Sequence, residues 1–356
     1  MDIGFARLMN QRIVTPWFTQ PGEVVAWLGA MQAQDYTGAL WSIGLRMTGA
    51  TERSIEQAIV DRAIVRTWPM RGTLHFVAAQ DVRWLLTLLT PRLIAGSAGR
   101  YRQLELDENI FAHSQAVFVE ALQGGKGLTR EELLHQLDAA GIATTGQRGY
   151  YLLVHAAQNG LLCFGPMQGK QQTFVLLDEW VPPTQPLGRE EALAELTRRY
   201  FTSHGPATLP DFTGWAGLTV TEAKIGLAGA GNALIQETVD HCTYWLPHST
   251  PTGKNDTPSG HLLPGFDEYI LGYKDRSAVL DPAFSNHICP GGNGVFQPTL
   301  VVAGQVVGTW KRVVKKGKVL ITPSPFHPLD EAESAMVAAA AERYGKFLGV
   351  RAELTK

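Results

Sequence analysis

The segment I-V-R-T-W-P-M-R-G-T-L-H-F-V, residues 64–77, decides the fold expected for the N-terminal part of the chain. It is rich in β-branched and aromatic residues and has a Pro–Gly break, which predicts a two-stranded ribbon of residues 64–67 and 73–77. A helix over residues 79–89 is expected to pack beside the ribbon. Helical patterns also precede it, at residues 21–31, 37–46 and 54–61. Three helices followed by a hairpin are the outline of a winged helix-turn-helix unit.

The same order of elements recurs twice along the chain. The second unit begins with a capping box of Thr129 and Glu132, and its remaining elements are expected at residues 149–159, 161–164 and 173–177. A proline-rich linker at residues 182–186 then leads into a third unit. That unit is predicted to contain helices at 190–201, 208–215 and 221–227 and strands at 234–238 and 242–246.

The C-terminal part of the chain has a different pattern. A polar, turn-rich linker is expected at residues 248–260, and residues 293–323 alternate short β-branched runs with glycine turns, before a final helix at 331–348. We therefore predict an α+β fold with three tandem winged helix-turn-helix units and a C-terminal antiparallel β-barrel or curled sheet. The expected units are residues 1–115, 116–182, 183–248 and 261–356.

The composition is that of an ordinary globular protein. Of the 356 residues, 45% are hydrophobic, the mean hydropathy is −0.05 and the net charge is −2. The chain has neither a signal-peptide pattern at its start nor a run of about 18 apolar residues, so no membrane contact is expected. The 3 cysteines are far apart, which suits a reducing compartment. We expect a cytoplasmic monomer, associated with the nucleoid when it binds DNA.

The most unusual local feature is M-Q-A-Q-D-Y, residues 31–36, in which two glutamines lie close together in an apolar stretch. On an unbroken helix, residues two apart point to different faces, so Gln32 and Gln34 can share a site only if the first helix ends near Gln32. The alternative is that both amides bond to free carbonyl groups at a helix end. The pair together with Asp35 favours a functional site.

Other polar residues are compatible with two interpretations each. The turn V-V-K-K-G-K-V, residues 313–319, presents lysines that either contact phosphate or form a solvated hairpin tip. His75 beside Arg71 is more typical of a structural residue than of a catalyst. Asp267, Glu268 and Asp275 form a carboxylate cluster, for which pairing with Lys274 and Arg276, or helix capping, is the simpler explanation. No metal-binding or nucleotide-binding motif is present, so neither a metal nor a cofactor is expected.

Four segments together make the chain similar to a known family. These are residues 31–36, residues 66–77, the stretch L-L-P-G-F-D-E-Y-I-L-G-Y-K-D-R-S at 262–277, and the pair N-G-V-F-Q-P-T and V-V-G-T-W-K-R at 293–299 and 306–312. In this order they resemble the AlkZ-type winged-helix DNA glycosylases. The resemblance implies three winged helices and a β-barrel curved into a C around a DNA channel. It also implies a hairpin that probes the minor groove, placed at residues 286–293 or at the lysine turn.

The resemblance further implies an activity and its residues. The family's Gln–apolar–Gln signature matches Gln32 and Gln34, which implies hydrolysis of the N-glycosidic bond of N7- or N3-alkylated purines, including bulky adducts and crosslinks, with damaged double-stranded DNA as the partner. Supporting roles are expected for Asp35, Trp41, Arg71 and His75. The expected DNA-binding residues are Arg148, Asn293, Lys311, Arg312, Lys315, Lys316 and Lys318. The alternatives are a winged-helix DNA-binding protein or regulator without catalytic activity, and a protein-interaction scaffold.

Overall fold

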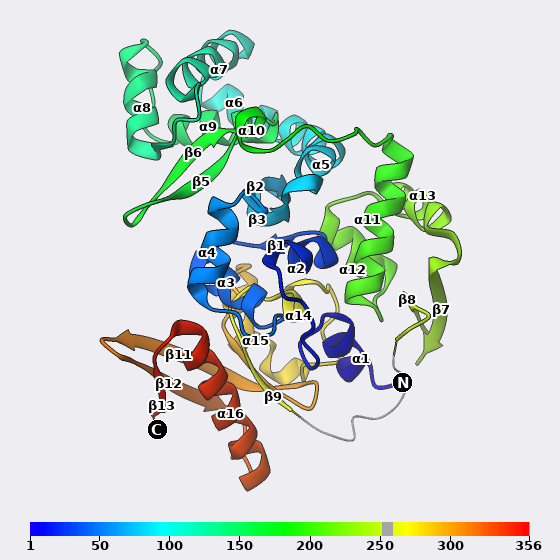
Figure 1. Ribbon diagram of the computed structural model, residues 1–356. Coiled ribbons are helices and arrows are strands. Elements are labelled where there is room, and N and C mark those ends of the chain that lie inside the picture. Colours follow the sequence, from blue (N-terminus) through cyan, green and yellow to red (C-terminus); the bar gives the residue numbers. More distant parts are fainter. Residues whose placement is uncertain (251–258, 356) are drawn as a thin grey trace.

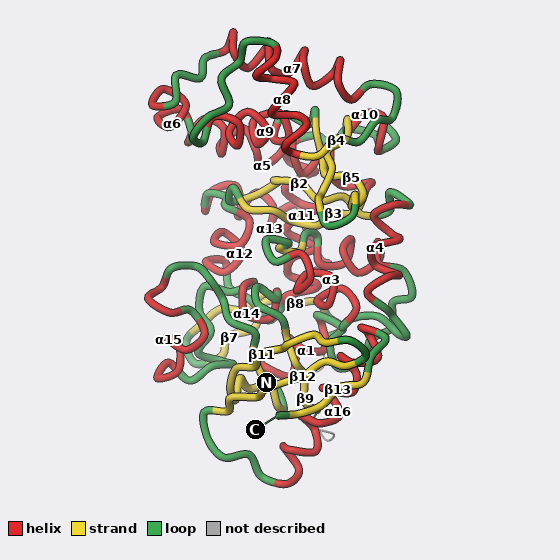
Figure 2. Tube along the Cα trace, turned by 90° about the vertical axis from the view of Figure 1, so that its left-hand side faces the viewer, coloured by secondary structure: helices red, strands yellow, loops and turns green. Residues whose placement is uncertain are grey.

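In the computed structural model, which describes residues 1–250 and 259–355, the chain curves into a C with a notch on one side (Figure 1). One arm of the C carries the hairpin of residues 162–176, and the other carries the hairpin of residues 305–325. The N-terminal helices and residues 189–247 form the body between the arms (Figure 2). Within the described ranges, no helix is long and apolar enough to cross a membrane.

The first winged unit has the predicted order of elements. It comprises α1 (Ile3–Asn10), α2 (Pro21–Leu28), β1 (Met31–Gln32), α3 (Tyr36–Gly44), α4 (Glu52–Val60), β2 (Ile64–Met70) and β3 (Thr73–Ala78). Helix α1 and strand β1 were not predicted, and most of the predicted elements have bounds that differ from those observed, two of them next to the M-Q-A-Q-D-Y segment. Helix α2 ends at Leu28 because Gly29 adopts a positive φ of 80°, and α3 begins at Tyr36 because Asp35, one residue earlier, caps it.

The second unit and the connection before it contain three helices that were not predicted from the sequence, at residues 98–103, 108–122 and 177–180. The connection from the first unit and the second unit itself comprise η1 (Ala79–Asp81), α5 (Val82–Gly96), α6 (Ala98–Gln103), α7 (Glu108–Leu122), β4 (Leu128–Thr129), α8 (Arg130–Ala139), α9 (Arg148–Gln158), β5 (Leu162–Gln168), β6 (Gln171–Leu176) and α10 (Leu177–Trp180). The Thr129–Glu132 capping box is present. Helix α7 crosses the boundary predicted between residues 115 and 116. Since Phe111 and Phe118 pack in the core of the second unit, the boundary lies before α7.

The third unit and the C-terminal sheet complete the fold. The third unit has α11 (Arg189–His204), α12 (Leu209–Ala216), α13 (Val220–Ala230), η2 (Gly231–Ala233), β7 (Leu234–Val239) and β8 (Cys242–Pro247). The C-terminal part has β9 (Gly260–Leu263), α14 (Glu268–Leu271), η3 (Pro282–Phe284), α15 (Ser285–Ile288), η4 (Pro290–Gly292), β10 (Thr299–Val302), β11 (Gln305–Lys315), β12 (Lys318–Pro325), α16 (Glu331–Leu348) and β13 (Arg351–Leu354). Most of the linker predicted at 248–260 lies outside the described residues.

The C-terminal strands form a curled five-stranded sheet in the order β13-β12-β11-β10-β9. Its pairs are antiparallel, as predicted, except for the parallel pair of β12 and β13. Helix α16 packs on β9 and β13 (Figure 1). The long hairpin of β11 and β12 extends from this sheet to the rim of the notch.

The wings of the first two units join into one sheet. Its order is β1-β3-β2-β5-β6-β4, and the junction is the antiparallel pairing of Arg66 in β2 with Phe164 in β5. Strand β1, which carries Gln32, lies at one edge of this six-stranded sheet. The sheet therefore connects the M-Q-A-Q-D-Y segment to the second unit, although the two are more than 90 residues apart in sequence.

The first unit shares its hydrophobic core with the C-terminal sheet. Trp41 of α3 is 1% exposed, and its indole N–H donates to Leu262 O at 2.7 Å. Nearby, Arg46 and Asp267 form an ion pair at 2.9 Å in which both side chains are fully buried. A second oxygen of Asp267 accepts a hydrogen bond from Arg46 at 2.9 Å. The two ends of the chain are thus held together by apolar packing and by one buried bidentate pair.

This ion pair yields a stability prediction. Asp267→Ala leaves the Arg46 guanidinium charged and unpaired in the core, and should lower the free energy of unfolding by about 3–5 kcal/mol. The double variant Arg46→Met/Asp267→Leu removes both charges and should be more stable than Asp267→Ala alone. Urea titrations of the three proteins measure these differences. A double variant no more stable than the single one would show that the unpaired charge is not the cause.

Candidate functional site

Gln32 is the last residue of β1, and Gln34 lies in the bend that follows it; we call residues 31–34 the glutamine strand. Helix α2 ends before it, at Leu28, and Gln32 pairs with His75 in the antiparallel register of β1 and β3. Ala33 continues the pairing, since its N–H donates to Leu74 O at 2.7 Å. The helix end that convergence of the two amides requires is therefore present before Gln32.

The surroundings of the two amides differ. Gln34 is exposed, and its Oε1 accepts a hydrogen bond from Leu74 N–H at 3.3 Å. Gln32 is 8% exposed, and its side-chain amide forms no hydrogen bond with the rest of residues 1–250 and 259–355. Between them, Ala33 O accepts from Arg66 Nη2 at 2.6 Å and Nε at 3.0 Å. The backbone of the glutamine strand is thus fixed while one amide is uncommitted.

A buried carboxylate holds the same strand from behind. Gln32 N–H donates to Oε1 of Glu268 at 3.1 Å, and Oε2 of Glu268 accepts from Trp215 Nε1 at 2.8 Å. His204 Nε2 lies 3.3 Å from the same oxygen. Burial alone would raise the pKa of Glu268, but the hydrogen bond and charge of His204 and the charge of Arg71 lower that pKa to about 2. Glu268 is therefore an ionised anchor at neutral pH.

His75 and Arg71 lie beside this anchor. His75 is fully buried; its Nδ1 lies 2.9 Å from Thr73 O and its Nε2 lies 3.3 Å from Arg71 Nη2. Because arginine only donates, Nε2 accepts and Nδ1 carries the proton. Arg71 also donates to Trp215 O. Burial, followed by the charge of Arg71, lowers the pKa of His75 to about 3. His75 is therefore a neutral structural partner of the glutamine strand.

The structure gives Asp35 and Trp41 structural positions. Asp35 Oδ1 accepts hydrogen bonds from Gly38 N–H and Thr37 Oγ1, both at 3.2 Å, and so caps α3. Trp41 lies in the core, with the Tyr344 ring 5.0 Å away, centroid to centroid. Asp35 is thus engaged as a helix cap, and Trp41 can affect the site only through packing.

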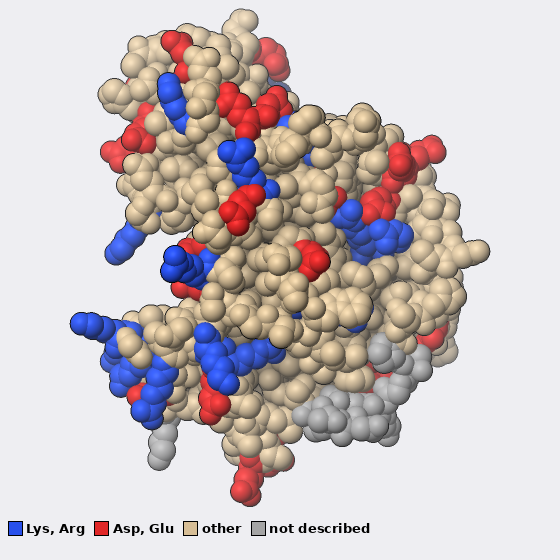
Figure 3. All heavy atoms as spheres, viewed as in Figure 1, with Lys and Arg blue, Asp and Glu red and all other residues tan. Residues whose placement is uncertain are grey.

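Basic side chains gather on the rim of the notch, along the arm formed by the C-terminal sheet (Figure 3). Lys311, Lys315 and Lys316 are exposed, and Lys316 and Gly317 form the hairpin turn, since Lys315 pairs with Lys318. Lys318 is partly neutralised by Glu353 at 2.8 Å. The hairpin thus places exposed cations at its tip, which confirms that the lysine turn is a hairpin.

Arg312 connects this hairpin to the N-terminal unit. Its Nη2 donates to Thr37 Oγ1 at 2.7 Å, and its Nη1 donates to the Tyr344 hydroxyl. Thr37 follows the glutamine strand by three residues. The hairpin at Arg312 and the residues that follow the glutamine strand are therefore in contact.

The other two residues predicted to bind DNA, Arg148 and Asn293, make hydrogen bonds to the backbone of loops and turns. Arg148, the first residue of α9, donates to Ala143 O at 2.8 Å and to Glu105 O at 3.1 Å, so its guanidinium joins two loops. Asn293 follows η4, and its Oδ1 accepts from Val295 N–H at 2.8 Å within a turn. Neither makes a hydrogen bond to the glutamine strand within the described part of the chain.

The predicted pairing of the carboxylate cluster is wrong, whereas the predicted capping is confirmed for Asp267. Asp267 caps α14 and pairs with Arg46, and Asp275 accepts from Ser277 N–H at 2.9 Å. Sequence analysis therefore missed Glu268, together with His204 and Trp215, as neighbours of the glutamine strand. The available signal was two consecutive carboxylates in the apolar run G-F-D-E-Y-I, because such carboxylates need buried partners.

The buried histidines make stability depend on pH. Burial, followed by the charges of Arg343 and Arg46, lowers the pKa of His261 to about 3. The pKa of His75 is lowered to a similar value. Both side chains take up a proton only on unfolding. Their contribution to the free energy of unfolding is therefore complete above about pH 6.5 and is lost as the pH falls from 6.5 toward 3. Lowering the pH from 7 to 5 should cost about 2 kcal/mol for each histidine.

Denaturant titrations of the wild type and of His75→Gln at pH 7 and pH 5 test this prediction. The loss of unfolding free energy between the two pH values should be about 2 kcal/mol smaller in the variant. An equal loss in both proteins would contradict the assignment of His75 as a buried neutral group.

Comparison with known proteins agrees with this fold. Residues 25–347 match the family described as DNA glycosylase AlkZ-like. A protein of Streptomyces sahachiroi named "Interstrand DNA cross-link repair glycosylase" is 28% identical in an alignment of 347 positions, and the match covers 90% of this chain and 90% of that protein. The solved structure of Streptomyces sahachiroi DNA glycosylase AlkZ is 23% identical, covers 99% of this chain and 98% of its own, and aligns with a TM-score of 0.80.

The structural likeness confirms the α+β fold of winged-helix units followed by a curled C-terminal sheet. The family match spans the glutamine strand and all four segments on which the resemblance rested. The chain belongs to the AlkZ-like DNA glycosylase family, whose members are hydrolytic enzymes that act on N-glycosyl bonds in DNA.

Proposed function

We propose that this protein excises alkylated purines, including purines joined in interstrand crosslinks, by directing a water held between Gln32 and Gln34 at C1′ of the damaged nucleotide. The observation that supports this most is the pair of amides two residues apart on a backbone that is fixed at the sheet edge, with the Gln32 amide uncommitted among the described residues. The relative that is named for crosslink repair matches over 90% of this chain, which supports the crosslink part of the proposal.

The chemistry suits side chains that cannot move a proton. A purine alkylated at N7 or N3 is already cationic, so the bond from C1′ to N9 breaks with both electrons passing to the purine, which leaves as a neutral base. The sugar is left with oxocarbenium character, and water adds at C1′ and releases a proton to solvent. At neutral pH an amide side chain neither gives up nor takes up a proton. The two glutamines therefore contribute by positioning the water and by electrostatic stabilisation.

The hydrogen bond from Leu74 N–H defines how Gln34 acts. A backbone donor requires the amide oxygen at that position, which leaves the second lone pair of Oε1 for the water. The Gln34 NH₂ group and both ends of the Gln32 amide remain for the same water, the sugar or its phosphate. The motif contains no lysine, and a covalent Schiff-base step has no nucleophile there. The proposed enzyme is therefore monofunctional.

The basic hairpin is proposed to contact DNA. Lys311, Lys315 and Lys316 are exposed at or near its tip, where each can displace counterions from a phosphate. Arg312 connects the hairpin to Thr37, so phosphate contacts made there would help to bring the lesion to the glutamine strand.

Substituting the glutamines tests the mechanism. Gln34→Ala removes the acceptor that orients water and should lower the single-turnover rate of N7-methylguanine excision by about 100-fold. Gln32→Ala should have an effect of similar order. Duplexes are treated with base after incubation, and strand breaks at abasic sites are quantified over time. A crosslinked duplex is assayed in parallel.

The matched control is Gln57→Ala, an exposed glutamine on α4 whose amide bonds only to Asp61. It should retain the wild-type rate on both substrates. Excision by Gln34→Ala at the wild-type rate would refute the role of the glutamines. The absence of abasic sites with wild-type protein on every substrate would refute the proposed reaction.

Glu268 should act as a positioning residue. The two oxygens of Glu268 accept hydrogen bonds from Gln32 N–H and from the Trp215 indole N–H. In Glu268→Gln, the NH₂ group of the amide faces one of these two donors and cannot accept its hydrogen bond, so the glutamine strand must shift. The single-turnover rate should fall about 10-fold, while affinity for undamaged duplex stays within about twofold. Glu342→Gln, an exposed carboxylate on α16, is the control. Equal losses of rate and DNA affinity would indicate general misfolding rather than positioning.

A further inference from the structure

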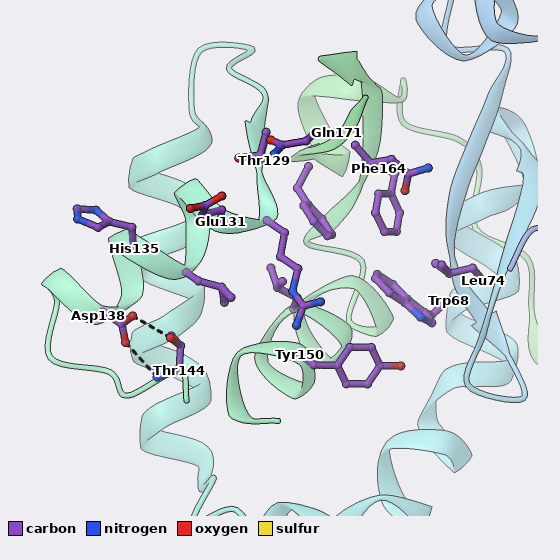
Figure 4. Close-up of a pocket in the computed structure, with 15 residues that line it drawn as sticks. Trp68, Leu74, Thr129, Glu131, His135, Asp138, Thr144, Tyr150, Phe164 and Gln171 are labelled. Atoms are coloured by element: carbon purple, nitrogen blue, oxygen red, sulfur yellow. Dashed lines mark hydrogen bonds between the residues drawn. The ribbon is translucent and has the colours of Figure 1, made fainter. Parts of the chain in front are cut away.

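A cavity of about 790 Å³ lies between the second unit and the wing of the first unit. Its residues come from β2, β3, α8, α9, β5 and β6, and include Trp68, Leu74, Leu134, Tyr150, Phe164 and Phe174 (Figure 4). The volume is within the range of about 300–1,000 Å³ that is typical of sites for small molecules. We call it the aromatic cavity.

One side of the aromatic cavity is built from rings. Trp68 lies 5.0 Å from Phe164, centroid to centroid, and 6.4 Å from the Tyr150 ring, which stands edge-on to it. Trp68 is 5% exposed, whereas Tyr150 is 37% exposed and lies nearer the opening. Figure 4 shows these three rings on one side of the space and Glu131, His135 and Asp138 on the other. The rings offer faces and edges for a planar aromatic group.

The aromatic cavity shares its wall with the glutamine strand. Leu74, which lines it, is the residue whose N–H holds Gln34 Oε1 at 3.3 Å. Gln172, also in its lining, accepts a hydrogen bond from Arg66. Arg66 in turn holds Ala33 O at 2.6 Å. Two independent hydrogen-bond connections therefore place the cavity next to the proposed catalytic amides.

The chemistry of the lining limits what the aromatic cavity can hold. Trp68, Leu74, Phe164 and Phe174 supply an apolar wall, where an anion or the polar edge of a normal base would lose its hydrogen bonds. The polar groups of the lining belong to other residues, which include Arg130, Glu131, Gln171 and Gln172. At the polar side, Asp138 is already bonded to Thr144, at 3.0 Å to its N–H and 2.8 Å to its hydroxyl. An uncharged, planar aromatic group is the ligand that this wall suits.

We propose that the aromatic cavity is a subsite for the planar aromatic part of a bulky purine adduct, which it holds while the adducted nucleotide is presented to Gln32 and Gln34. This inference rests on the proposed function and adds a substrate class to it. Adducts that carry a fused-ring group would gain contacts in the cavity, and a methyl adduct would gain none.

The test compares two duplexes, one with N7-methylguanine and one with guanine bearing a pyrenylmethyl group at N7. Tyr150→Ala removes one ring, and Leu134→Trp fills the cavity from α8. Each should lower the single-turnover efficiency on the pyrenylmethyl duplex about 10-fold and leave the methyl duplex within about twofold. The control is Tyr151→Ala, which removes the neighbouring tyrosine of α9; this side chain packs on Tyr101 and on the edge of Tyr150 but is not part of the cavity lining.

Affinities measured in the Gln34→Ala background complete the test, because they do not depend on cleavage. The pyrenylmethyl duplex should bind more tightly than the methyl duplex, and Tyr150→Ala and Leu134→Trp should each abolish that preference. One outcome would overturn this inference and leave the proposed function intact. In that outcome, Gln34→Ala loses activity on both duplexes, and the cavity variants affect the two duplexes equally. Full activity of Gln34→Ala on both would overturn the proposed function itself.

Discussion

The hydrogen bond from Gln32 N–H to the buried carboxylate of Glu268 is the contact on which the geometry of the site depends. Asp267 and Glu268 are neighbouring carboxylates in the C-terminal part of the chain. Asp267 pairs with Arg46, which follows α3, and Glu268 anchors β1, the first part of the glutamine strand. Buried charges are unfavourable unless they are paired, and Arg46, Arg71 and the Trp215 N–H supply the compensation. The two ends of the chain must therefore assemble before the glutamine strand has its final position.

This arrangement explains how neutral amides can contribute to a hydrolytic reaction. The backbone of the glutamine strand is held by β3, Arg66 and Glu268, so in the proposed mechanism little backbone freedom is lost when Gln32 and Gln34 bind water. The Gln34 amide is also oriented by a fixed donor, Leu74 N–H. The aromatic cavity shares Leu74 with this arrangement, and our proposal uses that link to join recognition of the lesion to the placement of its sugar.

Local signals in the sequence predicted much of the fold, because helix caps and short-range periodicity depend on neighbouring residues. Helix α16 has the predicted bounds, and the Thr129–Glu132 capping box and the lysine hairpin are present as expected. The pairing of β2 with β5 and the partners of Glu268 were not predictable. His204 and Trp215 lie more than 50 residues from Glu268 in sequence, and no local pattern identifies such partners. The two glutamines were recognisable from the sequence as an unusual pair. The predicted helix end near Gln32 was replaced in the structure by the short strand β1.

The most direct measurement is a crystal structure of the protein bound to duplex DNA that carries a cationic analogue of the abasic sugar. Our account predicts that the atom replacing C1′ faces Gln34, with a water at about 3 Å from Gln34 Oε1 lying between them, and with Gln32 in contact with the same water or sugar. A sugar bound elsewhere in the notch, with both amides facing bulk solvent, would contradict the assignment of the glutamine strand as the catalytic centre.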